Sequence, residues 1–164
     1  MPLYTNMDKS EEQHGGVLMG AWASDVDGWR KIKVVMDSGA AACVAPRSMA
    51  PHFAITDSPE QRAGVYYTSA NGAKLDNLGQ QELPIAFDNG VRAMTTFQIA
   101  DVSRPLMSVA KVCEMGNRVL FGSGGGVILN LASGQVTPFE MEDGVYVFTM
   151  WIPPLSKTPF GGQR

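Results

Sequence analysis

The sequence has few of the residues from which most catalytic and metal sites are built. Its 164 residues include two cysteines, Cys43 and Cys113, and two histidines, His14 and His52. No Cys/His cluster has the spacing of a zinc site, and a Ser/His or Cys/His nucleophile system has few members available. We therefore expect no metal and no cofactor, and we interpret both histidines as surface residues. Apolar residues flank each cysteine, which predicts small core hydrophobes, although the sequence leaves a disulfide between them open.

Charge of one sign and long apolar runs are also scarce. Charged residues make up 18% of the chain and the net charge is −3, so nothing favours binding to nucleic acid or to an anionic membrane. No apolar run approaches the roughly 18 residues of a membrane span. The first 16 residues lack the apolar stretch of a signal peptide. These absences predict a soluble protein of the cytoplasm or of an intracellular particle.

What the chain does have is a sizeable apolar fraction broken by many turn residues. Hydrophobic residues make up 45%, with 18 glycines and 10 prolines, which favours short strands over long helices. We predict a mostly β protein with one domain over residues 17–152. A flexible leader is expected over 1–16 and a flexible tail over 153–164.

The pattern predicts where several of these strands lie. Asn71-Gly72 lies between two β-prone arms and predicts a tight hairpin, because Asn-Gly suits positions with positive φ. One short helix is expected over Leu106–Met115, with an apolar face of Leu106, Val109, Ala110 and Cys113. The glycine run 122–126 is expected to be a turn, because no Lys-Ser/Thr follows it as a phosphate loop would require. Strands are predicted over 17–24, 29–36, 64–70, 73–79, 81–87, 91–99 and 145–152.

The most informative stretch is the one that leads to Asp37. An apolar, β-branched run that includes Val34 and Val35 ends at Asp37-Ser38-Gly39, and a row of alanines follows. A strand that delivers Asp-Ser-Gly to a tight turn is how aspartic peptidases present their catalytic carboxylate. Gly39 lets the backbone fold closely around the acid, and Ser38 supplies a hydroxyl beside it. The alternative is an ordinary β-turn, in which Asp and Gly are common for conformational reasons alone.

The order of these parts resembles that of the retropepsins, the single-domain aspartic proteases of retroviruses and retrotransposons. The shared features are the strand, Asp37-Ser38-Gly39-Ala40, the glycine-tipped hairpin and a short helix late in the chain. Residues 104–117, which read RPLMSVAKVCEMGN, look particularly like the equivalent segment of retrotransposon polyproteins. The resemblance covers roughly residues 30–150.

The resemblance implies a small closed β-barrel with one short C-terminal helix, which acts as a homodimer. Asp-Ser-Gly occurs once in the chain, so a two-aspartate site needs a second copy related by a two-fold axis. Asp37 would be the catalytic residue of each subunit, and Ser38 and Gly39 would support its loop. The hairpin would form a flap over a peptide or polyprotein substrate. The substrate-binding residues implied in this way are Ala40, Ala41, Ser69, Ala70, Asn71 and Gly72.

The sequence departs from the family at two points. Ala41 and Ala42 stand where retroviral relatives often carry another acid, and Ser103 stands before Arg104 where the family favours a glycine. Two alternatives to the peptidase also remain. One is a catalytically silent retropepsin-like module used for dimerisation or peptide binding, which would not need a carboxylate in that turn. The other is a small β-barrel with an accidental Asp-Ser-Gly.

Overall fold

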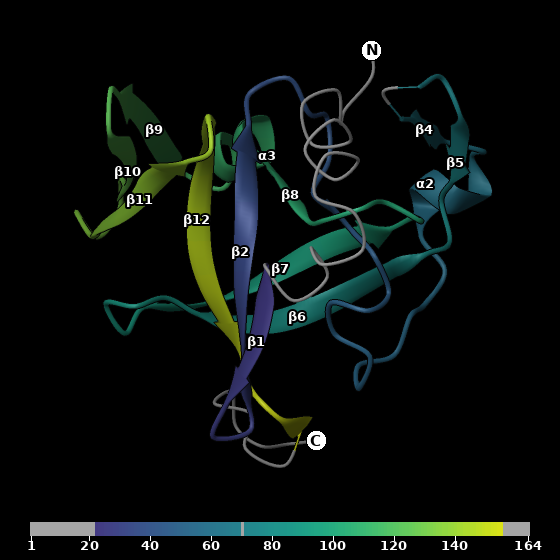
Figure 1. Cartoon of the computed structure of the whole chain (residues 1–164), viewed down its shortest axis with the longest axis horizontal. Helices are drawn as coiled ribbons and strands as arrows, with labels where there is room; N and C mark the ends of the chain where they lie inside the picture. Colours follow the sequence, from purple (N-terminus) through teal and green to yellow (C-terminus); the bar gives the residue numbers. More distant parts are fainter. Residues whose placement is uncertain (1–21, 70, 156–164) are drawn as a thin grey trace.

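The computed structural model describes residues 22–69 and 71–155, and within them the protein is mostly β (Figure 1). The expected leader 1–16 and the end of the expected tail, 156–164, lie outside the described residues. One sheet has ten strands in the order β1-β2-β8-β3-β7-β6-β12-β11-β10-β9, and β4 and β5 form a separate pair. The strands and helices in chain order are β1 (Ala23–Val26), β2 (Trp29–Asp37), β3 (Val44–Ala45), α2 (Pro59–Arg62), β4 (Tyr66–Thr68), β5 (Lys74–Asp76), β6 (Gln80–Ala86), β7 (Arg92–Ile99), β8 (Leu106–Ser108), α3 (Val109–Glu114), β9 (Asn117–Gly122), β10 (Gly125–Asn130), β11 (Val136–Glu142) and β12 (Val145–Ile152).

The apolar run before Asp37 forms strand β2, as predicted, and β2 has three partner strands in the large sheet. It pairs antiparallel with β1 and β12, and parallel with β8. Strand β12 also meets β6 at one residue pair, Trp151 with Ala86. The pairings that run from β2 through β8, β3, β7, β6 and β12 therefore return to β2.

Strand β8 is inserted between two strands that are neighbours in sequence. It pairs parallel with β2, so that Asp37 lies opposite Ser108, and antiparallel with β3, where Val44 lies opposite Leu106. The loop that joins β2 to β3 therefore passes over the end of β8. This arrangement brings residues far apart in the chain to the turn that follows Asp37.

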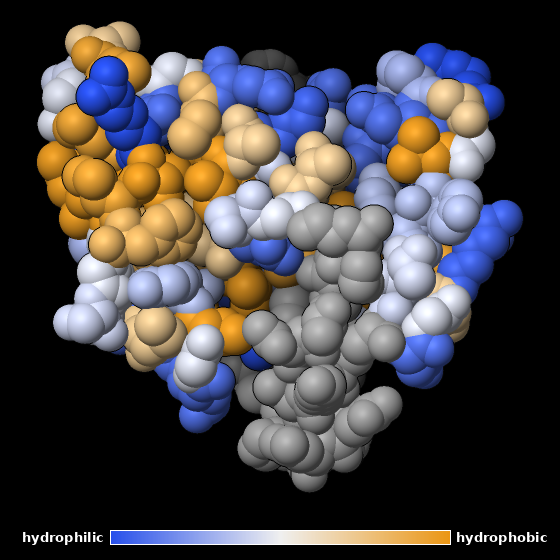
Figure 2. All heavy atoms as spheres, turned by 90° about the horizontal axis from the view of Figure 1, so that it is seen from above, coloured by the Kyte–Doolittle hydropathy of each residue, from blue (hydrophilic) through white to orange (hydrophobic). Residues whose placement is uncertain are grey.

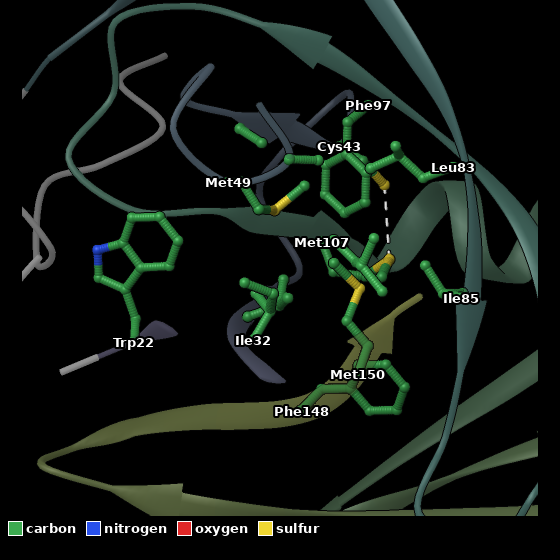
Figure 3. Close-up of a cluster of buried hydrophobic side chains, with 14 of the residues drawn as sticks. Trp22, Ile32, Cys43, Met49, Leu83, Ile85, Phe97, Met107, Phe148 and Met150 are labelled. Carbon is green, nitrogen blue, oxygen red and sulfur yellow. Dashed lines mark hydrogen bonds between the residues drawn. The ribbon is translucent and has the colours of Figure 1, made fainter. Parts of the chain in front are cut away.

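The main core lies between β2, β6, β7 and β12, and Figure 3 shows its centre. Its side chains come from the inward positions of these strands and include Ile32, Leu83, Phe97 and Phe148, each with at most 1% of its surface exposed. Burying a side chain of this size contributes about 1.5–3 kcal/mol. A second, smaller cluster contains Val35, Val44, Tyr67, Ala100, Val102 and Leu106.

The predicted helix is shorter than expected, and its predicted apolar face is only partly correct. Residues 106–108 form strand β8, and the helix begins after Ser108, whose hydroxyl caps it by accepting from Lys111 N at 3.1 Å. Cys43 is buried, but Cys113 is exposed, and both are free thiols. The helix packs through Val109, which the predicted face contained, and through Val112, which it did not.

The predicted hairpin is present, but its turn differs from the expected one. Ser69 N donates to Ala73 O and Gly72 N donates to Ser69 O, both at 3.0 Å. Gly72 has a φ of +87°, whereas Asn71 does not have a positive φ. The loop is therefore one residue longer than a two-residue Asn-Gly turn, and Gly72, unlike Asn71, has the left-handed conformation. The sequence reasoning also missed α2, which the buried Ser58 caps by accepting from Gln61 N.

Strands β9, β10 and β11 extend the sheet beyond β12 as a meander. The predicted turn in the glycine run is confined to Ser123 and Gly124, because Gly122 ends β9 and Gly125 begins β10. Figure 2 shows a large apolar surface on the side where Figure 1 places these strands. Leu120 and Phe121 of β9 are exposed. Neither described helix is long and apolar enough to cross a membrane.

Candidate active site

The turn after β2 holds Asp37 by backbone hydrogen bonds. Gly39 N donates to Asp37 Oδ1 at 2.8 Å, and Ala40 N approaches Asp37 O at 3.4 Å. The first bond orients the carboxylate toward the backbone of the turn. Asp37 as a whole is half-buried.

Ser108 also holds this turn, through two hydrogen bonds. Its hydroxyl donates to Ala40 O at 2.7 Å, and its backbone N–H contacts Cys43 Sγ at 3.3 Å. Ser108 is fully buried, so each of these bonds is shielded from water. Burial raises the pKa of the Cys43 thiol, while the contact with Ser108 and the nearby Lys111 act to lower it. A neutral Cys43 therefore serves as a small core residue under the turn.

The side chains around Asp37 are small, as the sequence indicated. Ser38 and Ala41 are exposed, Gly39 is half-buried and Ala40 is buried. Ser38 and Ala41 therefore leave the surface beside Asp37 open to close approach by another molecule. Ala40 differs, because its side chain is covered and its backbone groups take part in the hydrogen bonds of the turn.

The hairpin that was expected to form a flap stands apart from the end of β2 in Figure 1. At its tip, Ser69 is buried and its hydroxyl bonds to Asn71 Oδ1, whereas Asn71 and Gly72 are exposed. Ala70 lies outside the described residues. These bonds lie within the hairpin, so the structure does not bring its tip to Asp37.

The base of the hairpin is joined to the region of Asp37. Tyr67 of β4 packs in the same cluster as Val35 and Val44, and Leu75 of β5 packs against that cluster. Strand β2 carries Val35 two residues before Asp37, so the hairpin and the turn share an apolar support.

A network of buried side-chain hydrogen bonds also holds this hairpin. Asn77 Nδ2 donates to Gln98 Oε1 at 2.8 Å and approaches Tyr67 Oη at 3.3 Å. Gln98 Nε2 then donates to Gln80 Oε1 at 3.2 Å. Burial raises the pKa of Tyr67 to about 12, although the hydrogen bond from Asn77 lowers it. The tyrosine therefore stays neutral and anchors the hairpin to β6 and β7.

The sequence reasoning missed Ser108, Tyr67, Asn77 and Gln98 as supports of this region. A serine directly before a helical pattern is a cap signal and could have marked Ser108. Nothing in the sequence marks the other three, because their contacts join segments that are far apart. Among the described residues, no group of acids, histidines and cysteines could hold a metal ion. A cavity of about 480 Å³ reaches Cys43 and Met107 behind the turn, but Asp37 does not line it.

Comparisons with models of known protein families, with curated proteins and with solved structures found no match for this chain.

Proposed function

We propose that this protein is a homodimeric aspartic endopeptidase of the retropepsin type. The observation that carries the proposal is the Asp37 turn, in which a strand delivers a half-buried carboxylate held by Gly39 N and braced through Ser108. An ordinary surface turn does not need a buried serine from a distant strand to hold its carbonyl. The return of the strand pairings to β2 supports the small closed barrel that this class uses.

The chemistry needs a second Asp37, which a second copy would supply. Two carboxylates held within about 3 Å cannot both ionise readily, so they share a proton and titrate as a pair. The ionised member acts as a general base on a water molecule, and the protonated member donates to the scissile carbonyl. The small exposed side chains of Ser38 and Ala41 are compatible with two turns meeting about a two-fold axis.

The substrate we infer is an extended peptide, and processing of a polyprotein is the expected role. The hairpin would close over the substrate, with the backbone near Asn71 and Gly72 facing it. The base of the hairpin is held by contacts of Tyr67 and Asn77. Such closure excludes water other than the attacking molecule.

The test is cleavage of a mixed peptide library at mildly acidic pH, read by mass spectrometry, with Asp37→Asn beside the natural protein. Asparagine keeps an oxygen that accepts from Gly39 N, so the turn should survive while the general base is lost. Specific cuts that vanish in the variant are the expected result. Cuts that persist in the variant would contradict the proposal.

A second measurement separates the peptidase from its alternative. Sedimentation should show a dimer for both the natural protein and Asp37→Asn. A folded dimer that makes no cuts would favour the catalytically silent dimerisation or peptide-binding module. A monomer under assay conditions would contradict both.

A further inference from the structure

The far edge of β7 is open over most of its length. On one side β7 pairs with β6 from Arg92 to Gln98. On the other side β3 is so short that it reaches only Gln98 and Ile99. Within the described residues, no strand pairs with this second edge before Gln98. Four residue steps along a strand cover about 13 Å, so the open edge is long enough for a short peptide.

The direction of the backbone groups on this edge follows from one hydrogen bond. Gln98 N donates to Cys43 O at 2.8 Å, so Gln98 faces the β3 side. Backbone groups in an antiparallel strand alternate between its two edges, and therefore Thr96 and Met94 point to the same open side. Pro84 of β6 lies opposite Met94, and a proline fits there because that pair exchanges no hydrogen bonds.

The cavity of about 480 Å³ runs along this open edge. Its volume lies in the range of about 300–1,000 Å³ that is typical of ligand pockets. The side chains that line it across from β7 belong to α3 and β10 and include Val112 and Ile128. Figure 3 shows Ile85, Met107 and Phe148, which also line the cavity, among the core side chains. The open edge therefore borders an apolar cavity rather than flat surface.

The residues of β7 next to the cavity leave room for side chains of a bound strand. Ala93 and Thr95 share a face of β7 with Phe97, which is fully buried, and both are smaller than it. An added strand would place every second side chain on this face, next to the cavity. Its other side chains would lie on the face of Met94, which is 48% exposed.

We propose that the open edge of β7 binds an extended peptide segment of a partner polypeptide by strand addition, with apolar residues at alternate positions. The peptide would lie beside β7 as a continuation of β3. It would form hydrogen bonds with the backbone N–H and C=O groups of Met94 and Thr96. Main-chain bonds supply affinity in this mode of binding, and the pocket for alternate side chains supplies specificity. The site does not include Asp37, so it is independent of the peptidase proposal.

The test uses Asp37→Asn, which cannot cleave the probe, and the fluorescently labelled peptide Thr-Val-Thr-Val-Thr with blocked ends. Met94→Pro removes one backbone donor from the open edge and leaves the bonds to β6 in place. Met94→Ala is the matched control, because it keeps the donor and shortens the side chain. We expect binding that Met94→Pro weakens by about tenfold and Met94→Ala changes far less.

A second measurement covers the case in which Met94→Pro fails to fold. The same peptide, N-methylated at alternate amides, should lose binding in one methylation pattern and keep it in the other, because one edge of the peptide pairs with β7. Equal effects of both patterns, or of both Met94 variants, would overturn strand addition and indicate a general apolar pocket. A peptide affinity that Met94→Pro leaves unchanged would overturn the assignment of the site to this edge. Self-association that Met94→Pro removes, without binding of the peptide, would make the occupant a second copy instead.

Discussion

Ser108 donates a 2.7 Å hydrogen bond to the carbonyl of Ala40, and the two residues are 68 positions apart in the chain. The same hydroxyl accepts from Lys111 N and so begins α3. One buried side chain therefore joins the turn after Asp37 to helix α3.

Replacement of Ser108 by alanine should lower the free energy of unfolding by about 2 kcal/mol, because it removes a helix cap and leaves a buried carbonyl without its donor. Denaturant unfolding measures the change. Ser24→Ala is the matched control, because Ser24 is exposed on β1. The interpretation of Ser108 would be wrong if both variants lost the same stability.

The meander beyond β12 depends on a glycine with no room for a side chain. A Cβ at position 126 would clash with Leu120 O and with the ring of Phe139, whereas at Gly124 nothing lies within 4 Å. Gly126→Ala should therefore cost about 1–3 kcal/mol, and Gly124→Ala should cost little. Thermal unfolding of the two variants decides this. An equal midpoint for both would show that the strands can shift apart at no cost.

Tyr67 predicts how stability changes at high pH. Burial raises its pKa from the ordinary value of 10.0 to about 12, so the folded state holds the phenol proton more tightly than the unfolded state. The resulting stability is complete below the unfolded pKa and is lost as pH rises toward the folded pKa. The natural protein should therefore lose stability between these values more steeply than Tyr67→Phe.

The control for this titration is Tyr66→Phe, because Tyr66 is the exposed neighbour on the same strand. Thermal midpoints measured across the alkaline range should show the same slope for Tyr66→Phe and the natural protein. A slope that Tyr67→Phe leaves unchanged would contradict the burial of the phenol.

The two cysteines should differ in reactivity. Cys113 is exposed and Cys43 is buried, and burial raises the pKa of the Cys43 thiol, which disfavours its reactive thiolate. Iodoacetamide should modify Cys113 first in the folded protein, as mass spectrometry of the peptides will show. In denaturant both should react alike. Rapid modification of Cys43 without denaturant would mean that the turn above it opens readily.

Much of the fold was predictable because it depends on local pattern. The apolar alternation before Asp37 indicated β2, and the turn residues after Phe87 indicated the β6–β7 hairpin. The helix was predicted three residues too early, because Leu106 and Val109 fit helical spacing equally well. Leu106 is part of a strand because it pairs with Val35 and Val44. These partners are distant in sequence, so the local pattern around Leu106 does not reveal them.

The candidate site was predictable only in its central residue. Asp37 stood out because its neighbours share the pattern of one catalytic turn. Tyr67, Asn77 and Gln98, which anchor the hairpin, did not stand out, because they meet through buried hydrogen bonds between distant segments. Buried polar residues follow no periodic pattern that sequence analysis could detect. Their hydrogen-bond partners become known only once the order of the strands in the sheet is known.

The insertion of β8 between β2 and β3 has a consequence for how the protein folds. The turn at Asp37 cannot acquire its brace until the chain as far as Ser108 is present, and β2 gains its longest partner only with β12. Contacts between residues so distant in sequence make folding slow, because the entropy of loop closure is lost before the stabilising contacts form. During synthesis on a ribosome, the carboxylate would therefore reach its final geometry late, after most of the domain had left the exit tunnel.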